Sequence, residues 1–64
     1  MKKINENLYL YKGVKVTRCY KCYYAYVSVN KKSETTLISA STQREFMRDF
    51  NKFVTENGGL VKGK

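Results

Sequence analysis

The chemically most distinctive side chains of this chain are its two thiols, in the run Cys19-Tyr20-Lys21-Cys22. Cys-x-x-Cys spacing is typical of zinc ligands and of redox-active dithiols. A structural zinc site needs four Cys or His ligands, and this chain has two cysteines and no histidine. A dimer could assemble a four-cysteine site, and a disulfide or redox role is a further alternative. We expect incidental turn cysteines, with no bound metal and no cofactor.

Acid–base catalysis has little support in the composition. The chain has no histidine, the usual general base at neutral pH. Its acidic residues are separated along the chain, without the paired spacing of glycosidases or metal-dependent nucleases. They are Glu6, Glu34, Glu45, Asp49 and Glu56. We therefore expect a protein that is not an enzyme.

Charge favours a polyanionic partner. Thirteen Lys and Arg residues against five Asp and Glu leave a net charge of +8 on 64 residues. Such a charge density creates a positive potential that attracts nucleic acid, although lysines can also simply keep a surface soluble. Membrane-surface binding is less favoured, because the basic residues are not confined to one face of an amphipathic helix.

Three extended segments precede a helix in the pattern of the sequence. Leu8–Cys19 is rich in strand-forming residues, and Gly13 marks either a bulge or a junction of two short pieces. Tyr23–Val29 predicts the second strand, and the polar residues 30–33 predict a turn. The third strand is expected over Glu34–Ala40.

One amphipathic helix follows the strands. Thr42 and Glu45 match a capping box, and Asn57-Gly58-Gly59 supplies a helix end. The apolar residues between them are spaced by three and four, which predicts one buried stripe. They are Phe46, Met47, Phe50, Phe53 and Val54.

These elements predict a single domain over residues 1–64. The expected fold class is α+β, with a three-stranded antiparallel sheet packed on one C-terminal helix (βββα) and flexible tails at residues 1–7 and 60–64. No apolar stretch approaches the roughly 20 residues that span a bilayer, and no signal-peptide segment follows the first residues. We expect a cytoplasmic monomer or weak dimer.

Alternation along the strands divides the sheet into two faces. The apolar set, on which the helix should pack, is Val14, Val16, Tyr23, Ala25, Val27 and Val29. The opposite face carries Lys15, Thr17, Tyr24, Tyr26 and Ser28, with Lys12, Arg18, Lys31 and Lys32 near its margins. An uncovered face with aromatic and basic side chains suits nucleic acid. Tyrosines are also common on half-buried strands for packing reasons alone.

Several short motifs resemble the APETALA-type (ethylene-response-factor) DNA-binding domain and the similar arm-binding domains of phage and transposon integrases. The matching segments are Tyr11-Lys12-Gly13-Val14, Tyr23-Tyr24-Ala25-Tyr26-Val27, Asn30-Lys31-Lys32, the pair Leu37 and Thr42, and Glu45, Phe50 and Asn51. The chain departs from the family pattern at Ile38, Ala40 and Phe46-Met47.

The resemblance implies a DNA-binding domain that contacts the major groove with its sheet. It implies base contacts at Lys15, Thr17, Tyr26 and Ser28 and suggests a phage or mobile-element regulator or the arm-binding part of a recombinase. Two alternatives stay open. One is a small phage-type inhibitor or adaptor that binds an acidic host protein through its tyrosine-rich face or a strand edge. The other is single-stranded nucleic acid stacked on Tyr24 and Tyr26.

Overall fold

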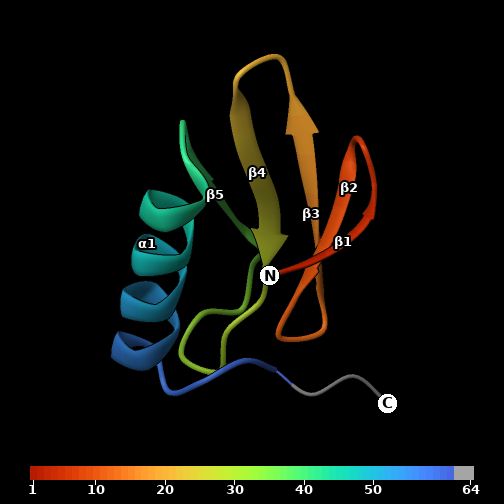
Figure 1. Ribbon diagram of the computed structural model, residues 1–64. Helices are drawn as coiled ribbons and strands as arrows, with labels where there is room; N and C mark the ends of the chain where they lie inside the picture. Colours follow the sequence, from red (N-terminus) through yellow and green to blue (C-terminus); the bar gives the residue numbers. More distant parts are fainter. Residues whose placement is uncertain (62–64) are drawn as a thin grey trace.

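The computed structural model describes residues 1–61, which form one twisted antiparallel sheet and one helix (Figure 1). The strands lie side by side in chain order. Their bounds are β1 Lys2–Asn5, β2 Leu8–Tyr11, β3 Val14–Cys19, β4 Cys22–Val27 and β5 Thr36–Ala40, and α1 spans Gln43–Glu56. The predicted α+β class is confirmed, with five strands in place of the three expected.

Leu8–Cys19 forms two strands, β2 and β3, which a hairpin turn at Lys12-Gly13 joins. Lys12 has φ 51° and Gly13 has φ 82°, the two consecutive positive values that tight hairpin turns require. Tyr11 lies opposite Val14 directly across this turn. Gly13 therefore marks the junction of two short strands and not a bulge within one strand.

A correction concerns β1, a strand where none was expected. It pairs with β2, placing Lys2 opposite Leu10 and Lys3 opposite Tyr9, and the register shifts before Asn5. All four of its residues are exposed. Backbone hydrogen bonding to β2, and not burial of side chains, accounts for this edge strand.

The helix begins and ends as its capping signals predict. Thr42 is the N-cap, and its Oγ1 accepts a hydrogen bond from the Glu45 N–H at 3.1 Å. The Glu45 carboxylate in turn accepts from Ser41 Oγ at 3.0 Å. At the other end Gly58 has φ 80°, and the Gly59 N–H donates to the Val54 carbonyl at 2.9 Å. This bond satisfies a carbonyl that the helix itself leaves free.

The core lies between α1 and one face of the sheet. The predicted apolar face is confirmed, since Val16, Ala25, Val27 and Val29 are buried and Val14 and Tyr23 pack against them. The helix contributes the fully buried rings of Phe46 and Phe50. In Figure 1 the helix runs along one side of the sheet, next to β5.

The segment after the helix returns to the sheet. Leu60 forms an antiparallel bridge with Val29, and the Val61 N–H donates to the Ser28 carbonyl at 3.1 Å. Leu60 and Val61 therefore fold back, while the rest of the expected tail, residues 62–64, lies outside the described residues. Within residues 1–61, no helix has the length and apolar character needed to cross a membrane.

Candidate nucleic-acid interface

The sheet face opposite α1 carries five of the predicted site residues. Residues paired across antiparallel strands share a face, and the register places Thr17 opposite Tyr24 and Tyr26 opposite Leu37. Lys15 and Ser28 fall on the same face by alternation, because Val16, Val27 and Val29 point into the core. We call this surface the open face.

β2 and β5 add residues to the open face that alternation along β3 and β4 does not identify. Leu8 lies opposite Thr17, and Leu10 lies opposite Lys15. β5 adds Ser39, opposite Tyr24, and Leu37, which is 52% exposed. Treating Lys12-Gly13 as a two-residue turn would have placed both hairpin leucines here, because the turn sets the register.

Two tyrosines form the aromatic part of the open face. The ring centroids of Tyr24 and Tyr26 lie 6.4 Å apart with an interplanar angle of 87°, an edge-to-face pair. Tyr24 is half-buried and Tyr26 is 65% exposed. Beside them, the hydroxyls of Ser28 and Thr35 are hydrogen bonded at 3.1 Å. The face thus presents both a stacking surface and hydroxyl groups that can donate or accept hydrogen bonds.

Lys12 and Arg18 lie on the helix side of the sheet. Lys12 Nζ donates to Asn51 Oδ1 on α1 at 2.8 Å. Arg18 lies opposite Tyr23, with its guanidinium carbon 6.0 Å from the Tyr23 ring centroid, a cation–π contact. The structure does not bring these two residues together with Lys15.

Lys31 and Lys32 follow β4 and lie near the end of the helix. The Lys31 N–H donates to the Asn57 carbonyl at 3.0 Å, and the Lys32 N–H donates to the Val29 carbonyl at 3.3 Å. Both side chains are exposed. They could contact a polyanion that extends beyond the open face but do not form part of it.

The net charge is carried by the sheet and not by the helix. Eight basic and two acidic residues precede α1, whereas α1 itself holds three of each. On the helix, Arg48 Nε lies 3.6 Å from Asp49 Oδ1. A polyanion is therefore attracted most strongly to the half of the chain that forms the sheet.

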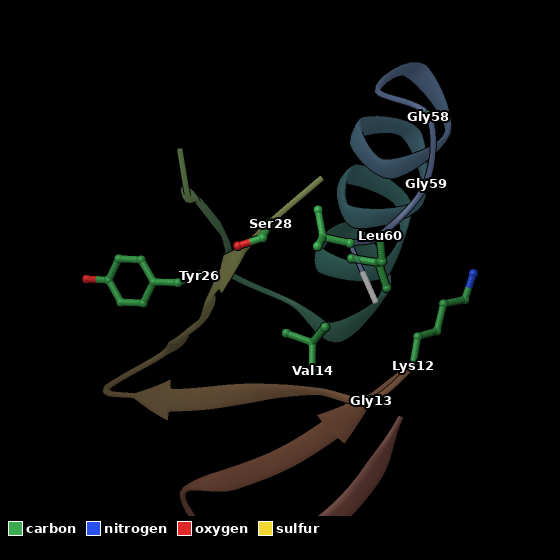
Figure 2. A pocket seen from close by; sticks show the side chains of 9 residues that line it. Lys12, Gly13, Val14, Tyr26, Ser28, Gly58, Gly59 and Leu60 are labelled. Carbon is green, nitrogen blue, oxygen red and sulfur yellow. The ribbon is translucent and has the colours of Figure 1, made fainter. Parts of the chain in front are cut away.

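One end of the open face is hollowed where β3 leaves β4. β3 pairs with β2 from Val14 onward, but its pairing with β4 starts only at Thr17. A groove of about 800 Å³ occupies this split, between the β2–β3 turn and the segment that follows α1. Figure 2 shows Val14 and Leu60 on its two sides, and Tyr26 and Ser28 also line it.

Cys19 and Cys22 lie at the opposite end of the same strands, directly across from each other. Both thiols are free and exposed. Within residues 1–61, no three Cys, His, Asp or Glu side chains gather closely enough to hold a metal ion. A single copy of the chain thus offers two thiol ligands at most.

Comparison with protein-family models, with curated proteins and with solved structures finds no significant match to this chain.

Proposed function

We propose that this chain binds duplex DNA through the open face of its sheet. The supporting observation is that Lys15, Thr17, Tyr24, Tyr26 and Ser28 share the one sheet face that α1 leaves uncovered. The concentration of net charge in the same half of the chain supplies the electrostatic attraction.

The width of the DNA major groove limits how many strands of the sheet can enter it. Neighbouring strands lie about 4.8 Å apart, so the five-stranded sheet is roughly 19 Å across, wider than the major groove at about 12 Å. A two-stranded ribbon fits this groove. The central strands β3 and β4 carry all the predicted base-contacting residues except Ser28, which directly follows β4. We therefore assign them as the inserted ribbon.

Affinity and sequence preference come from different side chains in this proposal. Lys15 on the face, and Lys31 and Lys32 beyond it, neutralise phosphates and release counterions. Thr17 and Tyr26 contact base edges, where a tyrosine ring can meet a thymine methyl group. The resemblance to APETALA-type domains supports this assignment, because β3, β4, β5 and α1 follow one another in the order of its βββα unit.

A pair of matched lysine variants tests the proposal. Lys15 and Lys52 are both exposed, but Lys15 is on the open face and Lys52 is on α1. Replacing one phosphate-contacting lysine lowers the salt slope of log K by about 0.9. We expect this change for Lys15→Ala and an unchanged slope for Lys52→Ala, measured with mixed-sequence duplex DNA at several salt concentrations.

Amide chemical shifts in the same titration locate the contact. Thr17, Tyr26 and Ser28 should shift at low salt, while the outer face of α1 should not. If these resonances stay unmoved with duplex DNA, the proposal fails. Shifts with single-stranded DNA alone would instead indicate stacking on the tyrosines.

The apolar residues of the open face favour a second candidate, binding of an acidic protein. Leu37 is 52% exposed beside Tyr26, and Leu8 and Leu10 lie half-buried across the face. Aromatic side chains are enriched at protein interfaces, and a basic surround would select an acidic partner. This candidate is favoured if neither duplex nor single-stranded DNA moves the open-face resonances.

A further inference from the structure

The hairpin that joins β3 to β4 ends in a pair of thiols held opposite each other. Cys19 and Cys22 are register partners on either side of the two-residue loop Tyr20-Lys21. They lie two residues beyond the pair Thr17 and Tyr24, so alternation places both thiols on the open face. Both are exposed and free.

The backbone of this loop holds a non-glycine residue in the left-handed region, as the β2–β3 turn does with Lys12. Tyr20 has φ 57° and is 92% exposed. At the β2–β3 turn, positive φ is shared by Lys12 and a glycine, and Lys12 is anchored on Asn51. A bulky residue at positive φ costs on the order of 1 kcal/mol, and such strain is concentrated at ligand-binding and switch sites. An aromatic ring left in solvent at a strained position points to a contact made outside the single chain.

Register partners on neighbouring strands are close enough for their two thiols to bind one metal ion. Residues directly opposite in an antiparallel pair have Cβ atoms about 4.5–5.5 Å apart. Tetrahedral zinc with Zn–S bonds of about 2.3 Å holds its sulfurs roughly 3.8 Å apart, which two side chains with this Cβ separation can reach by turning inward.

One chain leaves such a site half complete. The sequence has no further cysteine and no histidine, and the acidic residues in the described part of the chain form no group with the thiols. Structural zinc takes four ligands, and two copies of the hairpin tip supply four thiols. We propose that Cys19 and Cys22 bind Zn²⁺ together with the same two cysteines of a second copy of this chain.

Binding proceeds by ligand deprotonation, without any redox step. Each of the four thiols loses a proton to solvent as its sulfur bonds the metal, so the Zn²⁺ centre carries a net charge of about −2. Lys21 stands between the cysteines in each copy, and its positive charge partly offsets the negative charge of the metal centre. The two Tyr20 rings then lie beside the metal and lose exposed surface in the dimer.

A two-fold axis through the metal relates the two chains in this arrangement. Because the thiols are on the open face at the tip of β3 and β4, both open faces belong to one assembly. The dimer would then offer two equivalent surfaces to a polyanion, as in dimeric proteins that bind two DNA half-sites. The metal site itself is tested without nucleic acid and does not depend on it.

The test uses the full chain, reduced with a phosphine and titrated with Zn²⁺ alone. Native mass spectrometry and sedimentation should show a dimer with one zinc ion per two chains, and all four thiols should be protected from a thiol reagent. Co²⁺ in place of zinc should give the intense visible bands of tetrahedral cobalt thiolate. Cys19→Ser and Cys22→Ser should each lose the metal and the dimer. Lys52→Ala keeps both thiols and changes only an exposed position on α1, so it should retain both the metal and the dimer.

Three outcomes overturn the proposal. The first is a chain that stays monomeric and metal-free at saturating Zn²⁺. The second is one zinc ion bound per monomer, which would mean that water completes the site. The third is a dimer that persists in Cys22→Ser, because the two copies would then associate through another surface.

Discussion

Neighbouring tyrosines on β4 show how differently the two faces of this sheet are used. Tyr23 faces α1, where its ring lies edge-on to Tyr9 with centroids 5.6 Å apart and its hydroxyl accepts a hydrogen bond from Gln43 Nε2. Tyr24, one residue later, points to the open face and packs on Tyr26. Tyrosine thus packs in the core on the face toward α1, and it packs against an exposed aromatic ring on the open face.

The composition of a strand therefore does not reveal its role until it is known which sheet face each side chain lies on. On the face packed on α1, aromatic rings contact other core rings. The ring centroids of Tyr11 and Phe50, for example, lie 5.0 Å apart. The open face keeps Tyr26 and Leu37 more than half exposed. We therefore expect the stability of the fold to depend on the face packed on α1, and binding to depend on the open face.

The largest expected effect is a loss of stability when a core ring is removed between the sheet and α1. Phe50 is fully buried, so Phe50→Ala removes its packing and leaves a cavity. We expect a loss of about 3–5 kcal/mol in the free energy of unfolding, measured by urea denaturation. If the alanine variant does not fold, Phe50→Leu should give a smaller loss that can still be measured.

Leu37→Ala is the matched control on the open face, with an expected change within about 0.5 kcal/mol. A loss for Leu37→Ala as large as that for Phe50→Ala would contradict the comparison. It would show that the open face is packed against something in solution, for example a second copy.

The next effect is on binding. Tyr26→Ala should weaken nucleic-acid binding by about 1–3 kcal/mol, roughly 5- to 150-fold, because a stacking or interface tyrosine contributes this much. The unfolding free energy should change little, since the ring is 65% exposed. Fluorescence anisotropy with labelled DNA measures the affinity, and Tyr26→Phe separates the ring from its hydroxyl. Unchanged affinity in Tyr26→Ala would remove Tyr26 from the interface.

The half of the fold that packs on the helix could be predicted because its residues alternate clearly. Val14 and Val16 alternate with polar residues, and the capping pair Thr42 and Glu45 marks where the helix starts. In Leu8–Tyr11 every residue is apolar or aromatic, so the pattern there does not show which side chains lie on which face of the sheet. β1 is exposed along its whole length, and a strand that buries no side chains leaves no periodic signal.

The candidate site was predictable to the same extent and for the same reason. The five open-face residues follow from alternation along β3 and β4. Alternation from Val14 and Val16 already places Arg18 on the helix side, where its guanidinium lies over the Tyr23 ring. Lys12 lies in the turn, where alternation gives no direction, and Asn51 on the helix holds its long side chain. Leu8 and Leu10 needed the turn at Lys12-Gly13, where lysine occupies the position that Asn or Asp usually takes.

The smallest expected effect is on the proton affinity of the covered Tyr23. The hydrogen bond from Gln43, assisted by the nearby Arg18 guanidinium, lowers the pKa of Tyr23 below its ordinary value of about 10 despite partial burial. In the folded state the phenol therefore loses its proton at a lower pH than in the unfolded state. Its contribution to stability is present above the unfolded pKa and disappears as pH falls through the folded value.

Gln43→Ala should move the pKa of Tyr23 back toward the ordinary value and remove this alkaline gain in stability. NMR of the Tyr23 ring carbons through the alkaline range measures the change. Asn51→Ala is the control, because Asn51 Oδ1 accepts a hydrogen bond at 3.1 Å from the hydroxyl of another tyrosine, Tyr11. If Gln43→Ala leaves the Tyr23 titration where it was, the helix contact does not set the proton affinity. Packing alone would then hold Tyr23 in place on the face toward α1, as it holds Tyr24 on the open face.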